Sequence, residues 1–142
     1  MRIHDVLSGK GFDVIHAAPD SSVGALVSLL KEHNLGAVVV SSDGRGVAGI
    51  VSERDVIRRL DSDPELLTRP VSTIMTADVH CCTGKDSVES VMGTMTERRI
   101  RHLPVLDDSN KLAGIVSIGD LVKSQMAQLQ FERDQLEGYV SG

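Results

Sequence analysis

The chain carries the stretch VAGIVSERD at residues 47–55, and 65 residues later this stretch returns as LAGIVSIGD at residues 112–120. The same offset aligns further pairs across both halves: Val14 with Val79, Val23 with Val88, Val40 with Val105, and Asp43 with Asp108. Such a repeat decides the architecture, because each copy of the unit must adopt a similar local fold. The sequence therefore predicts one domain built from two related halves.

The length of the chain limits how these halves can be organised. Of the 142 residues, 41% are hydrophobic and 25% are charged, which is typical of a globular protein. A half of about 60 residues buries only about 60% of its unfolded surface and is marginal alone. We therefore expect the two halves to pack against each other.

Charge and hydropathy narrow the possible partners. The net charge of −5 argues against nucleic acid, because neutralising phosphates requires an excess of Lys and Arg. No apolar stretch approaches the roughly 20 residues of a membrane helix, and residues 1–5 lack the apolar core of a signal peptide. We expect a cytoplasmic protein that binds neither nucleic acid nor membranes. The basic run RRIRH at residues 98–102 suits a small anion.

The first copy predicts the element order β-α-β-β-α. Val14 and Ile15 form a short apolar start, and residues 23–30 place apolar side chains at helical spacing. Residues 37–40 are apolar without interruption and rich in β-branched side chains, as in a strand covered on both faces. Residues 47–51 form the returning strand, and residues 53–60 form the second helix.

The second copy predicts the same order. Val79 starts it, a helix occupies residues 88–95, strands occupy residues 103–106 and 112–116, and a helix begins at Ile118. Two similar segments, here called the first arm (residues 3–8) and the second arm (residues 71–76), precede the two copies. Residues 61–70, which contain two prolines, are expected to be the hinge between the halves.

The repeated motif resembles the cystathionine-β-synthase (CBS) domain, and two copies in tandem resemble a stand-alone Bateman module of the bacterial type. The resemblance covers residues 1–123 and rests on both copies of Gly-hydrophobic-hydrophobic-Ser-x-x-Asp and on IRHLPV at residues 100–105. It implies two pseudo-twofold-related α/β repeats packed through their sheets, at residues 1–63 and 64–123. It also implies homodimers, often flat discs, and adenosine compounds bound in clefts between the repeats.

The residues themselves offer a physical reason for such binding. Ser52 and Ser117 each end a strand and begin a helix, where free N–H groups and the helix dipole favour a phosphate. Asp55 and Asp120, one helical turn later, can accept hydrogen bonds from two ribose hydroxyls. Ser-x-x-Asp at a helix start is also a capping box, which requires no ligand. Spacing alone leaves both interpretations open.

Differences between the two copies favour a nucleotide site in the second copy. By resemblance Arg101 and His102 contact phosphates, whereas their counterparts in the first copy are Gly36 and Ala37. We predict a stronger nucleotide site at Val79, His80, Cys81, Arg101, His102, Pro104, Ser117 and Asp120. We predict a weaker second site at Val14, Ile15, Gly36, Ala37, Ser52, Arg54 and Asp55.

The ligand and the activity follow from the same resemblance. With no Trp and 2% aromatic residues, aliphatic side chains would have to enclose an adenine. AMP, ADP, ATP, S-adenosylmethionine and NAD are all candidates, and no cofactor is required. The sequence contains no catalytic motif, so we expect a regulatory module and no enzyme activity. His80, Cys81, Cys82 and His102 match no familiar zinc spacing, and we expect no metal site.

The tail, residues 124–142, is predicted to be helical. Its apolar residues continue a stripe with 4-3 spacing, interrupted by Arg133: Val122, Met126, Leu129, Leu136 and Val140. Such a stripe is typical of a helix that packs on its own sheet or on a dimer mate. We expect it to cover the body of the protein. The alternative function is a scaffold that keeps the fold, binds no nucleotide and uses this helix to contact an unknown protein partner.

Overall fold

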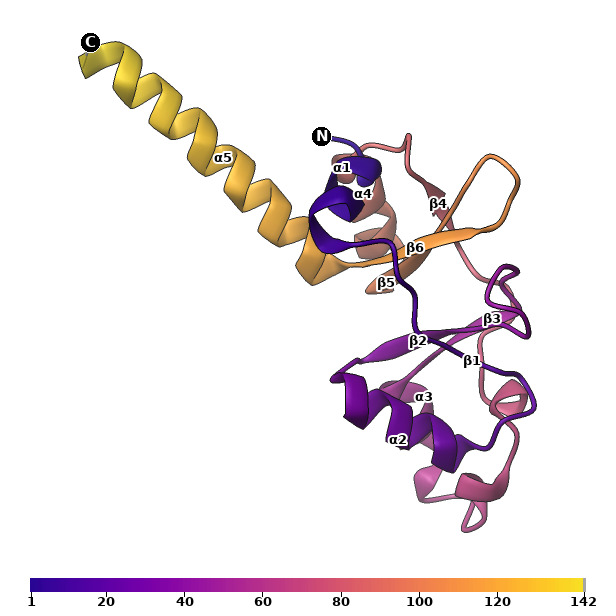
Figure 1. Ribbon diagram of the computed structural model, residues 1–142. Helices are drawn as coiled ribbons and strands as arrows, with labels where there is room; N and C mark the ends of the chain where they lie inside the picture. The colour runs from indigo at the N-terminus through magenta and orange to yellow at the C-terminus, as the bar shows by residue number, and fades with distance from the viewer. Residues whose placement is uncertain (142) are drawn as a thin grey trace.

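Two three-stranded sheets face each other at the centre of the molecule, with helices on their outer sides (Figure 1). The structure, a computed structural model, describes residues 1–141. The first sheet contains β1 (His16–Ala17), β2 (Ala37–Val40) and β3 (Gly49–Ser52), and the second contains β4 (Cys82–Thr83), β5 (His102–Leu106) and β6 (Leu112–Ser117). In each sheet the first two strands are parallel and the last two antiparallel. The predicted pair of related α/β units is confirmed.

The helices occupy equivalent places in the two halves. Helices α2 (Val23–His33) and α3 (Glu53–Leu60) cover the first sheet, and α1 (Ile3–Lys10), α4 (Val88–Arg98) and the start of α5 (Ile118–Ser141) cover the second (Figure 1). The hydroxyl of Ser22 caps α2 by accepting the Ala25 N–H, and that of Ser87 caps α4 by accepting the Ser90 N–H. The repeat thus extends to the capping residues.

Strand β2 shows why the predicted order of elements is adopted. Its four residues, Ala37–Val40, are all buried, because α2 and α3 cover one face and the second sheet the other. Strands with β-branched residues on both faces are favoured in such a place. The bounds of β2 and of α3 agree with the prediction. Strands β1 and β4 begin slightly after the predicted starts at Val14 and Val79.

The two arms cross over between the halves. Residues of α1, which precedes the first copy, are buried in the core of the second half together with Val116 and Leu121. In the same way, Val71 and Ile74, which precede the second copy, belong to the core of the first half. Each half is therefore completed by a segment that lies ahead of the other, which holds the halves together as one unit.

Equivalent glycines make this crossover possible. A Cβ at Gly49 would lie 2.7 Å from the carbonyl oxygen of Thr76, and a Cβ at Gly114 would lie 2.8 Å from a methyl carbon of Leu7. Both distances are shorter than a packed Cβ tolerates. The glycine of the repeated Ala-Gly-Ile-Val run is thus required because an arm crosses the strand there.

The segment between the halves is more ordered than a hinge. It contains the short 3₁₀ helix η1 (Leu66–Thr68), and a second, η2 (Val71–Thr73), follows in the second arm. Leu66 is buried in the first core, and Arg69 is bonded to Asp63 with a distance of 3.1 Å. The expectation of a hinge at residues 61–70 is wrong, because Leu66 anchors this segment under α2.

The expectation that the tail covers the body is also wrong. Helix α5 is continuous with the last helix of the second copy and projects away from the body (Figure 1). Residues 129–140 are all exposed. Gly142, the last residue of the predicted tail, lies outside the described residues. No helix within residues 1–141, α5 included, has the length and hydropathy needed to cross a membrane.

Candidate functional site

Both Ser-x-x-Asp motifs form capping boxes. In the first copy the Ser52 N–H donates to Asp55 Oδ2 at 2.8 Å, and the Asp55 N–H donates to Ser52 Oγ at 3.4 Å. In the second copy the matching distances are 2.9 Å between Ser117 N and Asp120 Oδ2 and 3.1 Å between Asp120 N and Ser117 Oγ. The capping interpretation of the sequence is confirmed for both copies. Because each bond to a carboxylate uses only one oxygen, the other can still accept from a ligand.

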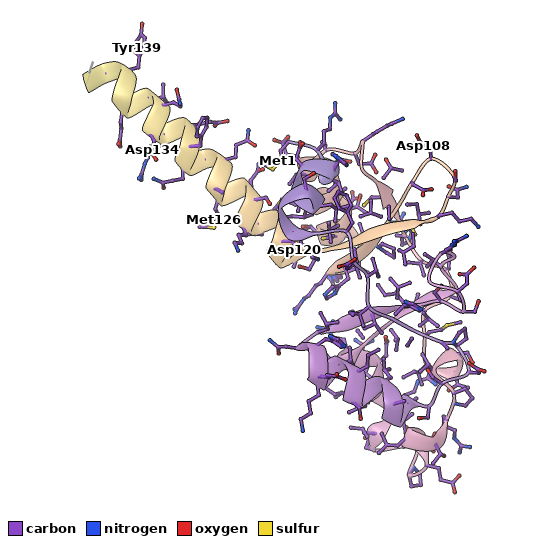
Figure 2. The ribbon with its side chains drawn as sticks, viewed as in Figure 1. Met1, Asp108, Asp120, Met126, Asp134 and Tyr139 are labelled. Carbon is purple, nitrogen blue, oxygen red and sulfur yellow. The ribbon has the colours of Figure 1, made fainter. Side chains whose placement is uncertain are left out.

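The two aspartates differ in what else they contact. Asp120 forms an ion pair with Lys10, whose Nζ lies 2.5 Å from Oδ2. Asp55 has no cationic side chain within ion-pair distance among residues 1–141. Figure 2 shows Asp120 at the base of α5, where this helix meets α1. The second motif is thus occupied by a cation from the chain itself, and the first motif is not.

Lys10 also replaces a backbone contact that the first half makes. In the first half the Thr76 N–H donates to the carbonyl of Ile50 at 2.9 Å. At the equivalent strand position in the second half, Lys10 Nζ donates to the carbonyl of Ile115 at 2.7 Å. Lys10 therefore satisfies two acceptors of the second motif at once, the Ile115 carbonyl and the Asp120 carboxylate.

This contact changes the acidity of Asp120. Burial raises the pKa of the Asp120 carboxyl, but the hydrogen bond and positive charge of Lys10, together with bonds from Ser117, outweigh it. The pKa therefore lies below its ordinary value. Asp120 is ionised at neutral pH, and its charge is already compensated.

A cleft of about 450 Å³ opens beside the first motif, a volume within the usual range of small-molecule sites. The first half contributes the start of β2, strand β3 and the start of α3, and the second half contributes residues 99–102. Its polar lining consists of Ser52, Glu53, Arg54, Asp55, Arg58, Thr76, Arg99, Arg101 and His102. The apolar lining includes Ile50, Val51 and Ile100.

The cleft regroups residues that the sequence analysis had divided between two sites. Arg101 and His102 were predicted to act with Ser117 and Asp120, but they line the cleft of Ser52 and Asp55. The cause is the face-to-face packing of the sheets, which brings the start of β5 opposite the end of β3. Gly36 and Ala37, predicted for the weaker site, line the same cleft. Pro104 is buried in the middle of β5.

His102 lies between the two motifs. Its ring carbon Cε1 would be 3.8 Å from a Cβ at Gly36, so it reaches across to the first half. Burial, and then the positive charges of Lys10 and Arg101, lower the pKa of His102, against the opposing charges of Asp120 and Glu53. His102 is therefore a neutral side chain at pH 7, able to donate one hydrogen bond and accept another.

Other predicted residues lie away from the cleft. His80 Nε2 accepts from Arg98 Nη1 at 2.9 Å, beside the end of α4. Cys81 is exposed and is bonded weakly to the carbonyl of Val79 at 3.8 Å. Val14 and Ile15 are half-buried ahead of β1. None of these five residues lines the cleft.

Sequence reasoning missed four polar residues of the cleft lining and one contact. Arg58 and Arg99 had no assigned place in either predicted site, and Thr76 and Glu53 had no assigned role. Arg99 belongs to the basic run at residues 98–102, which was the available signal. Lys10 is the last residue of α1, and nothing in a local sequence pattern connects it to Asp120. Within residues 1–141, no three His, Cys, Asp or Glu side chains gather as metal ligands.

The family follows from a comparison with known domains. The family model of the CBS domain matches residues 5–62 and again residues 71–127. The chain belongs to the CBS-domain family. The two matches together span most of the chain, and their boundaries separate the two copies of the motif. This CBS pair therefore has the element order and the crossover of arms described above.

A curated relative and a solved structure both match most of the CBS pair. It is 33% identical over 149 residues to the CBS domain-containing protein CBSX3, mitochondrial, of Arabidopsis thaliana, covering 99% of this chain and 72% of that protein. The crystal structure of the CBS-domain containing protein ATU1752 from Agrobacterium tumefaciens has 38% identity and a TM-score of 0.83, covering 88% of this chain and 99% of that one.

A second solved structure contains ligands. It is the CBS domain pair of protein MJ0100 in complex with 5'-methylthioadenosine and S-adenosyl-L-methionine. It has 22% identity and a TM-score of 0.79, and the match covers 90% of this chain and 98% of that one. At this identity the comparison shows the common fold alone.

Proposed function

We propose that this CBS pair is a regulatory module that binds a phosphorylated adenosine compound in the cleft beside Asp55. The observation that carries the proposal is the cleft itself, where one open ribose acceptor faces a group of arginines from both halves. The module senses its ligand and has no catalytic role of its own. The ligand belongs to the group AMP, ADP, ATP and NAD, and S-adenosylmethionine is the comparison compound without a phosphate.

The charges of the cleft favour a phosphate. Four arginines, Arg54, Arg58, Arg99 and Arg101, line the cleft against only two carboxylates, Glu53 and Asp55. Arginine presents several donors in a plane and pairs with phosphate through two bonds at a time. A ligand with negative charge compensates this excess, whereas a neutral adenosine would leave it unpaired.

The remaining surfaces fit the other parts of a nucleotide. Asp55 can accept from the ribose hydroxyls through the oxygen that the capping box leaves free. Ile50, Val51 and Ile100 offer aliphatic contacts for the base, as expected in a protein with 2% aromatic residues. The complex of MJ0100 with two adenosyl compounds, neither of which carries a phosphate, supports the adenosine part of this ligand.

Backbone strain at Arg99 supports a role for its side chain. Arg99 ends α4 in the left-handed region with φ of 56°, at the position where α2 ends with Asn34 at φ of 52°. Asn adopts this conformation readily, but for Arg it costs about 1 kcal/mol or more. An arginine at this helix end, with its side chain along the cleft, indicates that the guanidinium has a use that offsets the strain.

Regulation would follow from the position of the cleft between the halves. A ligand there contacts β3 and α3 of the first half and residues 99–102 of the second. It therefore favours the relative orientation in which both sets of contacts form. The shift between orientations is limited by the difference in affinity that the ligand has for them.

Thermal unfolding tests this proposal. The purified full chain, checked for carried-over ligand, would be melted with AMP, ADP, ATP, NAD and S-adenosylmethionine in turn. A ligand at 100 times its Kd adds about 2.7 kcal/mol, which raises the Tm by roughly 4 °C for a domain of this size. We expect the phosphorylated compounds to raise it and S-adenosylmethionine to raise it less.

Two matched arginine variants test whether a ligand-induced rise in Tm comes from binding in the cleft. Arg101→Gln removes a lining cation, and Arg45→Gln removes an exposed arginine that does not line the cleft. The first should abolish most of the rise and the second should keep it. A folded, ligand-free protein with no rise for any compound would refute the proposal.

One observation favours the alternative scaffold function. Helix α5 presents a long exposed apolar surface away from the cleft, which suits a contact with another chain. The two functions can coexist, because the cleft and α5 are separate surfaces. Absence of nucleotide binding combined with binding through α5 would identify the scaffold.

A further inference from the structure

Helix α5 is much longer than the fold requires. Its counterpart in the first half, α3, has 8 residues, whereas α5 has 24. The first turns of α5 contact α1, α4 and β6, and the rest projects from the body (Figure 1). In Figure 2, Met126, Asp134 and Tyr139 mark this projecting part. An isolated helical segment of this length is marginal in water, so its order requires a partner.

The projecting part carries a stripe of apolar residues that is interrupted by Arg133. The positions with 4-3 spacing, here called the α5 stripe, are Val122, Met126, Leu129, Arg133, Leu136 and Val140. The apolar members are exposed by 39% at Val122 to 83% at Val140. A stripe with this spacing is the seam of a two-helix coiled coil. Contiguous exposed apolar surface of this kind marks an interaction site.

We propose that the α5 stripe pairs antiparallel with the α5 stripe of a second copy of the chain. In the register centred on residue 131, every stripe residue meets a stripe residue of the other copy. Val122 then lies opposite Val140, Met126 opposite Leu136, and Leu129 opposite Arg133. The interface is isologous, because each contact occurs twice about a twofold axis.

Charge complementarity selects this direction. Antiparallel pairing brings Lys123 of one copy beside Glu137 of the other. At the centre it brings the two Arg133 side chains beside the two Glu132 side chains. Parallel pairing would place Arg133 opposite Arg133 in the seam and Glu132 beside Glu137, which are both like-charge contacts. The antiparallel orientation pairs Lys123 with Glu137 and keeps the two Arg133 side chains out of a shared layer, and its one like-charge contact, between the two Glu132 side chains, is flanked by the Arg133 side chains.

The mass of the full chain in solution, measured by light scattering after size exclusion, tests the pairing. Leu136→Glu places a charge in the stripe. Phe131→Glu is the matched control, because Phe131 lies on the opposite side of α5 and is similarly exposed, at 63% against 67% for Leu136. We expect the wild type and Phe131→Glu to share one mass and Leu136→Glu to have half of it.

Cross-linking tests the direction. In a Cys81→Ser background, one chain would carry Met126→Cys and a differently tagged chain Leu136→Cys. Antiparallel pairing predicts a disulfide between the two different chains and none between two Met126→Cys chains. A monomeric wild type, equal masses for wild type and Leu136→Glu, halved mass in both variants, or a disulfide between two Met126→Cys chains would each overturn the proposal. Nucleotide-induced changes in Tm are an independent measurement.

Discussion

Lys10 and Asp120 form an ion pair of 2.5 Å that joins the end of α1 to the start of α5. The pair lies at the second copy of the repeated motif, and no such pair occupies the first copy within residues 1–141. The chain thus repeats a motif in sequence while giving the two copies different surroundings. The second copy closes the fold around its own lysine, and the first keeps its aspartate open to the cleft.

Replacing Lys10 by Ala should weaken the fold. It leaves the Asp120 carboxylate and the Ile115 carbonyl without their donor, and we expect the free energy of unfolding to fall by about 1 kcal/mol. The control is Lys85→Ala, because the pair of Lys85 with Asp108 is far more exposed, at 83% and 88%. Urea denaturation of both variants measures the difference. Equal free energies of unfolding for the two variants would show that the Lys10 contact stabilises the fold no more than an exposed ion pair does.

Replacing Arg99 by Gly should separate stability from binding. Gly adopts the left-handed conformation without strain, so Arg99→Gly should unfold at the same or a slightly higher temperature than wild type. It also removes a cation from the cleft, so nucleotide affinity should fall about tenfold. Asn34→Gly, at the equivalent helix end, should leave affinity unchanged. Unchanged affinity in Arg99→Gly would remove Arg99 from the site.

The pH dependence of stability should reveal His102. Burial, then the charges of Lys10 and Arg101, hold the pKa of folded His102 below the 6.5 of an ordinary histidine. As pH falls through about 6.5, the unfolded chain binds a proton that the folded chain excludes, so stability decreases until the lower pKa is reached. Above that range His102 contributes no pH dependence.

A variant isolates this contribution. His102→Gln should lose less stability than wild type between pH 7.5 and pH 5.5, measured by urea denaturation at each pH. Asp120, whose pKa is lowered, stays ionised in this range and changes neither curve. If wild type and variant lost the same stability over this pH range, the group responsible would be a residue other than His102.

Replacing glycine by alanine should change the stability of the protein in opposite directions at two positions. Gly49→Ala would push a methyl group against the Thr76 carbonyl and the Met75 sulfur, each 2.7 Å away, and should cost about 1 to 3 kcal/mol. Gly93→Ala lies within α4 with nothing within 4 Å, and should gain up to about 1 kcal/mol. Thermal unfolding measures both. A neutral Gly49→Ala would contradict the close crossing of the second arm over β3.

Local patterns predicted the elements well. The bounds of β2 and α3 were predicted because an unbroken β-branched run and a Ser-x-x-Asp cap are signals within a few residues. The strand starts were predicted too early at Val14 and Val79, because an apolar dipeptide marks burial as readily as strand pairing.

Long-range relationships explain what the sequence did not predict. The crossing of the arms, the placement of Arg101 and His102 beside Asp55, and the ion pair of Lys10 all depend on how the halves pack. A sequence repeat indicates that the two halves have similar folds. It does not indicate which residues of one half line a cleft beside the other. Likewise, the stripe predicted that the tail is a helix with an apolar face. It did not predict that the tail projects from the body, which happens because the tail continues the helix that begins at Ile118.

The most direct test compares nucleotide binding in Asp55→Asn and Asp120→Asn. Asparagine keeps an oxygen for each capping box, so both variants should fold, and isothermal titration calorimetry with the nucleotide that most raises the Tm measures affinity. We predict that Asp55→Asn weakens binding about tenfold or more, because the charged ribose acceptor is lost, and that Asp120→Asn stays within about threefold of wild type. Strong loss in Asp120→Asn with normal binding in Asp55→Asn would place the ligand at the second motif and contradict the account.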